Sequence, residues 1–483
     1  MTTLACAPRV SASTQIPAGD RIPLPQKIAF SIGVNTEYMA TGLLTGSLWM
    51  PYFNIGMGIR PSVLSLVLAI LLTWNAFSDP LMGNISDNTR TRWGRRRPFI
   101  AVGAVLTGCL YPLFWYMPGG MGDAAEVAYL VVLGIAFFSC YTMWSMPYYG
   151  LQMELTPNYD ERTRLAAWMA FFGKVSNLLG GWVLAFATSS WFTNPATGKG
   201  DIVVGMKVVC WIIAAAIICF GLAPALFVKE RYYQIEVNRQ PRDPFWRSLK
   251  ESAHCKPMWL LIGISFFMVL GSASVATLTQ YVNIYYIFDG NLSAAAVVGG
   301  WKSTVLVVTG IVLIPAWTWL AERFDKKAVL VSMILFTMIG HLTNYVCMRP
   351  DMPYLQILSG VFESAAISAV WLFIPSMKAD IADHDELQTH RRREGSLNSF
   401  FSWFIKASMT CAVGMGGLVL ELCGFTAKIA HQPPEVLQRM FWTYLILPVC
   451  IQGIAAIIAC YYPLTRRRMG EIRLELEARR GRI

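Results

Sequence analysis

The chain has 483 residues, of which 55% are hydrophobic and 14% charged, and its mean hydropathy is +0.46. This composition excludes an ordinary soluble domain and is typical of a protein whose surface mostly faces lipid. The net charge of +11 would suggest nucleic acid in a soluble protein, but the Lys and Arg residues lie in short segments between apolar runs, which argues against a nucleic-acid partner.

Residues 1–26 are polar and lack the continuous apolar run of a cleaved signal peptide, so we expect a cytoplasmic N-terminal tail. Beyond this tail the sequence contains about twelve apolar runs, each close to the roughly 20 residues that cross a bilayer as a helix. We expect these spans near residues 27–53, 62–86, 98–117, 126–152, 164–189, 205–228, 257–286, 295–320, 328–347, 353–377, 396–424 and 438–462. The sequence therefore predicts an all-α membrane protein.

The loops between the predicted spans alternate in charge. Lys and Arg gather at 90–97, 162–164, 229–256, 323–327, 378–393 and 466–482. The other loops carry few basic residues, so the positive-inside rule places the basic set, together with both termini, in the cytoplasm. A single orientation fits all of the predicted spans.

The segment 229–256 is a long polar stretch that separates six predicted spans from six. The basic loops after the second and eighth spans lie at equivalent positions, as in repeats related by an axis along the membrane normal. We expect an N-terminal half at 27–228, a cytoplasmic linker at 229–256, a C-terminal half at 257–465 and a basic cytoplasmic tail at 466–483. This layout resembles the major facilitator fold.

The stretch "SDPLMGNISDNTRTRWGRRRPFI" places an acid near the end of the second apolar run and five arginines just after it. A carboxylate in the bilayer interior costs about 2.5–3.5 kcal/mol, so we expect Asp79 to be paired, protonated or bound to a cation. Pro80 leaves the carbonyl of Ala76 without its helical donor, and Asn75 lies one turn before Asp79 on the same face. The alternative to a functional site is a structural polar contact between helices.

Five segments along the chain carry a family resemblance: "WNAFSDPLMGNISDNTRTRWGRRRPFI", "YTMWSMPYYGL", "DERTRL", "ERFDKKAVL" and "ADIADHDELQTHRRREGSLNSFFSWFIKASMT". Together they resemble the glycoside-pentoside-hexuronide cation symporters of the major facilitator superfamily, the family of melibiose permease. The likeness covers residues 27–463. It implies secondary active transport of a sugar with a cation by alternating access, in the cell membrane and, for a bacterial protein, in the inner membrane.

In the resembled family a cation site is built from two acids one turn apart on the second helix and a third acid on the fourth helix. The matching positions here are Asn75, Asp79 and Ser145, so two of the three carboxylates are missing. One carboxylate suits a proton carrier better than a tight sodium site, because burial favours the protonated form. Side-chain and backbone oxygens still offer ligands to sodium, so both cations stay open and the proton is favoured.

The resemblance also matches a cationic residue of the C-terminal half to Lys406, in "SWFIKASMT". Ser399, Ser402, Lys406 and Thr410 recur at helical spacing and form a polar stripe on an otherwise apolar helix. A buried ammonium needs an acidic partner, and we expect Asp79 to be that partner and to tie the halves together. The alternative is that Lys406 extends to the membrane interface.

For the sugar, the resemblance implies an acid on the first helix and an aromatic residue on the fourth. These roles match Tyr38, with Glu37 adjacent, and Tyr149, and the choice between Glu37 and Tyr38 stays open. The arginine that the family places on the fifth helix is absent, and Lys174 is the candidate to reach the same cavity. Lining residues expected from the second half are Gln280, Tyr281, Glu363, Trp403 and Lys406.

Two charged loops are candidates for a cytoplasmic gate. We expect Asp87 with Arg95, Arg96 and Arg97 after the second span to face Asp380 and Asp383 before the eleventh, with salt bridges between the loops closing the inner side. Topology signalling by the arginines and a solvated acidic loop are the alternatives. The acids and the histidines near them fit no established ligand spacing, so we expect no metal site.

The sequence gives less support to other functional classes. No GxxxxGK[ST], HExxH or GxSxG motif is present, so we do not expect an enzyme. A lysolipid or amphiphile symporter is the more serious alternative, because relatives with the same acidic second helix carry amphiphiles. The expected partners are a small sugar and the lipid bilayer, with no obligate protein partner and no cofactor beyond co-transported H⁺ or Na⁺.

Overall fold

The computed structural model describes residues 21–480 except 119, 157–158, 195–199, 231–254, 369–372, 390–393, 427–428 and 430. The N-terminal half contains α1 (Leu24–Ser31), α2 (Val34–Glu37), η1 (Tyr38–Leu48), η2 (Pro51–Gly56), α3 (Pro61–Asn88), α4 (Arg97–Trp115), α5 (Asp123–Glu154), α6 (Tyr159–Gly180), α7 (Val183–Ala187) and α8 (Ile202–Phe227). Most of the predicted linker lies outside the described residues.

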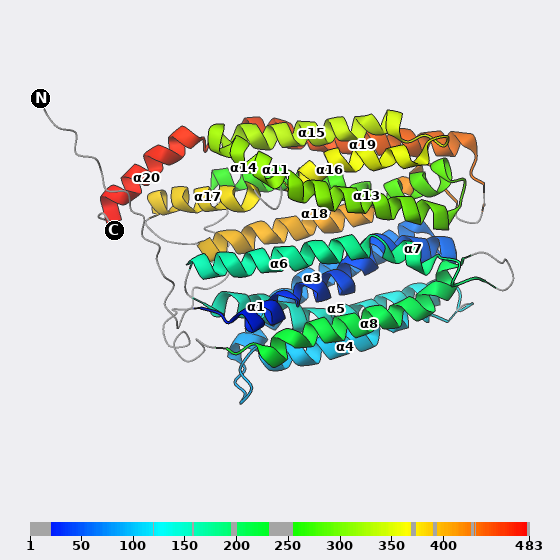
Figure 1. Cartoon of the computed structure of the whole chain (residues 1–483), viewed down its shortest axis with the longest axis horizontal. Helices are drawn as coiled ribbons and strands as arrows, with labels where there is room; N and C mark the ends of the chain where they lie inside the picture. The colour runs from blue at the N-terminus through cyan, green and yellow to red at the C-terminus, as the bar shows by residue number, and fades with distance from the viewer. Residues whose placement is uncertain are drawn as a thin grey trace, which may run out of the picture.

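The C-terminal half repeats this pattern of long helices. It contains α11 (Lys256–Ser274), α12 (Ala276–Tyr281), η3 (Val282–Ile287), α13 (Leu292–Val312), α14 (Ile314–Arg323), α15 (Lys326–Cys347), η4 (Pro353–Leu358), α16 (Ser359–Ser368), α17 (Ile374–Thr389), α18 (Glu394–Leu422) and α19 (Pro434–Cys460). The predicted basic tail forms the helix α20 (Arg466–Arg480). Figure 1 shows the two halves as two layers of helices that lie one above the other, with α1 and α20 toward the same end of the bundle.

Ten helices among the described residues are long and apolar enough to cross a membrane, and they coincide with ten of the twelve predicted spans. They are Pro61–Ser86, Arg97–Trp115, Asp123–Gln152, Arg164–Ala187, Ile202–Phe227, Lys256–Ile287, Leu292–Val312, Lys326–Cys347, Phe400–Leu422 and Pro434–Cys460. In the remaining two predicted spans, 27–53 and 353–377, the described residues form shorter helices. The predicted all-α membrane fold is confirmed.

The first span changes its helical type within the membrane. The chain passes from α2 into η1, an 11-residue helix of the wide π type, at the junction between Glu37 and Tyr38. A second π-type segment begins at Pro51. Backbone of this kind is frequent at functional sites. In a membrane it is tolerated where protein or a cavity surrounds it. The polar residues of the first span are therefore carried by an irregular helix.

Small residues allow close helix packing within the N-terminal half. A Cβ on Gly103 of α4 would lie 2.6 Å from the backbone nitrogen of Trp144 on α5. A Cβ on Gly108 would lie 2.3 Å from the side chain of Ile218 on α8. Such contacts replace the hydrophobic driving force that is missing between helices in lipid, so they hold α4, α5 and α8 as one body.

The two halves meet along α3 and α18, which pack against each other. Polar contacts join the halves at the end of the bundle where α3 begins and α18 ends, which we call the far end. There the amide of Gly417 donates to Ser65 Oγ at 2.8 Å, and the amide of Ser62 donates to Glu421 Oε1 at 3.3 Å. The structure therefore represents a conformation in which the halves are closed at the far end.

Aromatic side chains extend this closure to the other helices of the interface. The hydroxyl of Tyr281 donates to Asn54 Oδ1 at 2.5 Å, and the indole of Trp182 donates to Thr304 Oγ1 at 3.0 Å. The ring of Trp182 also packs edge-on against Trp301. Each contact joins one half to the other, so opening the far end requires all of them to separate.

Candidate functional site

An ion pair between the halves lies at the centre of the α3–α18 interface. Lys406 Nζ of α18 contacts the carboxylate of Asp79 on α3, which is the pairing that the sequence analysis expects. The Asp79 side chain is 9% exposed and that of Lys406 is 40% exposed. The pair thus joins a buried acid of one half to a partly accessible cation of the other.

Thr142 of α5 supports the acid from the neighbouring helix. Its hydroxyl donates to Asp79 Oδ1 at 3.2 Å and accepts from Asn75 Nδ2 at 2.8 Å. Ser78 Oγ lies 2.9 Å from the same hydroxyl. We call Asn75, Ser78, Asp79, Thr142 and Lys406 the Asp79 cluster; Thr142 connects the predicted residues Asn75 and Asp79 within it.

Sequence reasoning missed Thr142 and named Ser145, the next residue on the same face of α5. Ser145 is buried, but the described bond from α5 to Asp79 comes from Thr142. The signal was present in the sequence, because residues three apart on a helix share a face. Ser145 as a cation ligand stays a prediction.

The sequence left open whether Glu37 or Tyr38 faces the sugar site, and the structure gives the two residues different surroundings. Glu37 Oε2 accepts a hydrogen bond from the hydroxyl of Tyr149 on α5. Lys406 lies close enough to interact electrostatically with the same carboxylate. Tyr38 instead packs its ring over Gly180 of α6. Glu37, Tyr149 and Lys406 therefore come together, while Tyr38 faces a different neighbour.

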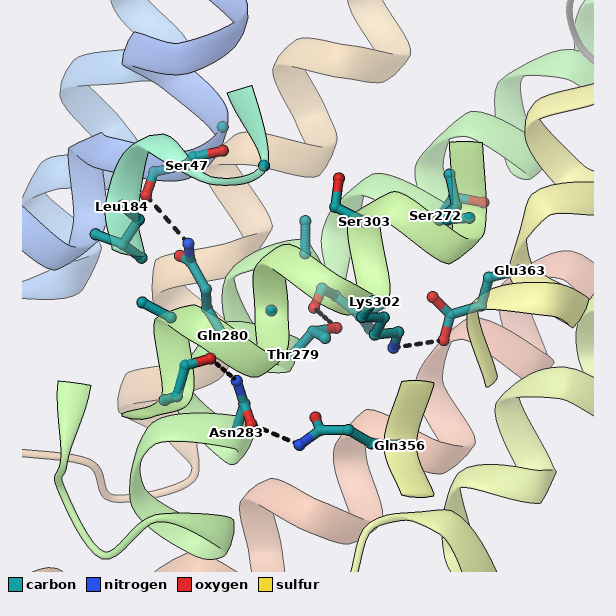
Figure 2. A pocket seen from close by; sticks show the side chains of 18 of the residues that line it. Ser47, Leu184, Ser272, Thr279, Gln280, Asn283, Lys302, Ser303, Gln356 and Glu363 are labelled. Atoms are coloured by element: carbon teal, nitrogen blue, oxygen red, sulfur yellow. Dashed lines mark hydrogen bonds and ion pairs between the residues drawn. The ribbon is translucent and has the colours of Figure 1, made fainter. Parts of the chain in front are cut away.

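A cavity of about 360 Å³ lies between the halves, next to α12 and α13. This volume is at the lower end of the range for small-molecule pockets. Three of the predicted binding residues line it, namely Tyr38 from the first span, Gln280 and Glu363. Gln280 also donates to the carbonyl of Ser47 at 3.1 Å, so it closes the cavity against the first span, as Figure 2 shows.

A second buried ion pair lies in the cavity wall. Lys302 Nζ of α13 lies 2.9 Å from Glu363 Oε1 of α16 (Figure 2), and both residues belong to the C-terminal half. His341 of α15 lines the same cavity. Sequence reasoning named Glu363 but missed Lys302 and His341; a lysine inside an apolar span was the available signal, because such charges seldom face lipid.

Trp403 and Lys174 neither line this cavity nor belong to the group formed by Glu37, Tyr149 and Lys406. Trp403 of α18 is 54% exposed and packs against Phe404. Lys174 of α6 is half-buried and does not line the cavity. Their predicted contacts with a substrate stay predictions.

The predicted gate arginines make contacts with the start of the linker and with α8. The amides of Arg95, Arg96 and Arg97 donate to the Glu230 carboxylate at 3.0, 2.9 and 3.1 Å, so an acid stabilises the N-terminus of α4. Arg97 Nε also donates to the carbonyl of Ala225 at 2.6 Å.

On the other half, Lys326 Nζ donates to Asp380 Oδ2 at 2.6 Å. Asp383 lies on the same helix as Asp380, α17, and Asp87 lies on α3. Salt bridges between the two loops stay a prediction.

Comparison with known proteins gives a consistent result over almost the whole chain. Residues 30–466 match the model of the family described as MFS/sugar transport protein. The glucuronide carrier protein homolog of Escherichia coli is 23% identical, with 94% of this chain and 95% of that protein covered. The sodium-dependent lysophosphatidylcholine symporter 1-B of Danio rerio is 22% identical, with 96% and 91% covered.

The fold has solved counterparts as well. The crystal structure of a D-xylose–proton symporter superposes with a TM-score of 0.61 at 14% identity and covers 91% of this chain and 96% of that one. The family relationship expected from the sequence motifs is confirmed, and it identifies a multi-pass membrane transporter rather than an enzyme. By its match over residues 30–466, the chain belongs to the MFS/sugar transport protein family.

Proposed function

We propose that the protein is a symporter that moves a saccharide or glycoside together with a proton by alternating access of its two halves. The observation that carries this proposal is the Asp79–Lys406 ion pair, which joins α3 of one half to α18 of the other. A proton or cation on Asp79 weakens its attraction for Lys406 and frees the halves to rock. Cation binding and conformational change then depend on the same contact.

The polar groups available near this pair favour the proton over sodium. Asp79 is the carboxylate within the Asp79 cluster, and its neighbours Asn75, Ser78 and Thr142 are neutral. The other carboxylate near Lys406, Glu37, accepts a hydrogen bond from Tyr149. A hard cation such as Na⁺ prefers several oxygen ligands, often charged ones, whereas a proton needs one carboxylate. Coupling to sodium is the alternative, and it would use the same oxygens.

A lysolipid substrate is the second candidate because several relatives are named for it. The cavity wall supports the proposal of a sugar by offering amide, hydroxyl and charged side chains beside its apolar ones, among them Thr279, Gln280, Ser303 and Lys302. A saccharide offers hydroxyl groups to such a wall, while an acyl chain would leave these groups without partners.

Uptake into proteoliposomes tests the proposed function directly. Labelled α- and β-galactosides, glucosides, xylosides and glucuronides are offered under an imposed pH gradient and, separately, under a sodium gradient. Accumulation of one sugar with the pH gradient is the expected result. Accumulation that follows only the sodium gradient would replace the proton by sodium, and uptake of lysolipid in place of every sugar would overturn the choice of substrate.

Replacing Thr142 with valine is expected to shift half-saturation of uptake to a proton concentration about 10- to 100-fold lower, because the ionised carboxylate of Asp79 loses a hydrogen bond and takes up a proton more readily. The hydroxyl donates to Asp79 Oδ1, and a hydrogen bond to a charged group contributes about 1.5–3 kcal/mol. The measurement is the proton concentration that half-saturates uptake. Thr142→Ser keeps the hydroxyl and is the matched control, so equal shifts in both variants would contradict a role for this bond.

A further inference from the structure

The Lys302–Glu363 pair differs from the Asp79–Lys406 pair in where it lies and what surrounds it. Both side chains come from the C-terminal half, they are 10% and 17% exposed, and both line the cavity. A buried ion pair contributes little to stability compared with well-packed apolar residues. Its position in the wall of a small-molecule cavity therefore points to a role in binding.

The Glu363 carboxylate is bonded unevenly. Lys302 Nζ at 2.9 Å, Ser359 Oγ at 3.3 Å and Asn344 Nδ2 at 3.4 Å all donate to Oε1. In the described part of the chain no donor is recorded for the other oxygen, Oε2. One carboxylate oxygen is thus held in place while the other remains available to a proton.

The groups that face this pair come from each helix packed around it. Lys302 and Glu363 lie on α13 and α16, His341 and Cys347 on α15, and Tyr444 on α19, all close enough to interact electrostatically with one member of the pair. Lys302 and Glu363 carry opposite charges, and tyrosine and cysteine are ordinarily neutral near pH 7. Lys302 is accordingly the cation available to an anion in this cavity.

Two buried polar atoms beside the pair have no partner within the described chain. They are Nδ1 of His341, which is 5% exposed, and Oδ1 of Asn344, which is fully buried. Buried polar atoms are normally hydrogen-bonded, so each such atom calls for a ligand or a water molecule. His341 lines the cavity, and its ring nitrogen can bond a hydroxyl group there.

We propose that the cavity binds a hydroxylated small molecule through a carboxylate group, which pairs with Lys302 while Glu363 takes up one proton. The exchange is balanced: the Lys302–Glu363 ion pair breaks, a Lys302–ligand ion pair forms, and one proton from solution forms an O–H bond on Glu363. His341, which lines the cavity, supplies a hydrogen bond to a hydroxyl group of the ligand.

The proton is required by charge balance in a buried place. If the ligand carboxylate displaced Glu363 without it, two carboxylates would share one ammonium in a low-dielectric cavity, and like charges at such distances repel strongly. Uptake of a proton restores neutrality, so ligand binding and protonation become one event. The inference rests on the proposed function for the access of a sugar to this cavity, but it assigns a proton that is separate from the one at Asp79.

Calorimetry on the purified full-length protein tests the proposal without any gradient. D-glucuronate and D-galacturonate are titrated in phosphate and in Tris, whose ionisation enthalpies differ, so the difference in heat counts protons exchanged. The methyl esters of the two acids are the matched ligands without charge. We expect about one proton taken up per acid bound, none per ester, and acid affinity that rises up to tenfold for each pH unit lowered.

Glu363→Gln separates this exchange from simple anion binding. Because the internal competitor for Lys302 is neutral in this variant, the acids are expected to bind at least tenfold more tightly at pH 7.5 with no proton uptake. Asp289→Asn, a change at an exposed acid paired with His431, is the control and is expected to behave as the native protein.

Acid binding without proton uptake in the native protein, equal affinity for acids and esters, or no binding of either acid would overturn the proposal, and these readings need no variant. A transporter that accumulates neutral glycosides under a pH gradient but takes up no proton with these acids would keep the proposed function and lose this inference. Proton uptake in calorimetry without gradient-driven accumulation would keep this inference and contradict the proposed function.

Discussion

Asp79→Asn is expected to abolish the accumulation of sugar against its gradient while sugar exchange across the membrane persists. Asparagine has nearly the shape of aspartate but takes up no proton and carries no charge, so the ion pair is lost and Lys406 keeps only its electrostatic interaction with Glu37. Breaking a buried pair costs about 3–5 kcal/mol. Because the Lys406 side chain is 40% exposed, water offsets part of this cost, and we expect about 3 kcal/mol or less.

The comparison of two transport modes separates coupling from damage to the fold. Gradient-driven accumulation and counterflow exchange are measured in the same proteoliposomes for Asp79→Asn, Lys406→Met and the double variant. Removing both charges eliminates the unpaired ammonium, so the double variant is expected to exchange sugar better than Asp79→Asn and still to accumulate none. Accumulation at the native level by Asp79→Asn would show that a residue other than Asp79 couples the cation to sugar transport.

Gly417→Ala is expected to shift the protein toward a conformation open at the far end and to reduce uptake at least about fivefold. A Cβ at this position would lie 2.1 Å from the carbonyl oxygen of Pro61 and 2.3 Å from Ser65 Oγ, both in the other half. Since one of these atoms is backbone, relief requires the halves to separate. Overpacking of this kind costs about 1–3 kcal/mol, which shifts a two-state equilibrium about 5- to 150-fold.

To measure this shift, Ser47 is replaced with cysteine. A membrane-impermeant maleimide is then added on the side of the membrane that the far end faces, and labelling of the cysteine is followed. Ser47 lines the cavity near the closed end, so its labelling is expected to increase in Gly417→Ala. Gly414→Ala is the matched control one turn earlier on α18, because its Cβ would meet Ala69 at an ordinary 3.7 Å. Native uptake and unchanged labelling in Gly417→Ala would contradict the role of this contact.

The sequence predicted the spans well because an apolar run of membrane length is a signal that each helix carries by itself. All ten helices that are long and apolar enough coincide with predicted spans. The breaks in the first span were not predicted, since Gly33 and the π-type turns after Glu37 depend on the surrounding helices. A Cβ on Gly33 would lie 2.7 Å from Pro224 of α8, a contact that no local pattern contains.

The candidate site was predicted only where one residue stood out from its own helix. Asp79, Lys406 and Glu363 are charges in apolar runs, and each lies in an ion pair in the structure. Thr142 and His341 carry no charge that sets them apart, and their importance arises from neighbours on other helices. The sequence alone does not show which of the binding residues lie in the Asp79 cluster and which line a separate cavity.

The placement of Lys302 and Glu363 on one half has an electrical consequence. When the halves rock, these two side chains move together, so the pair carries no net charge through the membrane field. Moving one elementary charge across 100 mV corresponds to about 2.3 kcal/mol, and this pair avoids that work in either direction. If a ligand carboxylate replaces Glu363 as the partner of Lys302 and a proton neutralises Glu363, the cavity with ligand has the same net charge as the cavity without it. Membrane voltage therefore acts on the Asp79–Lys406 pair and its cation, and leaves the movement of this second site unaffected.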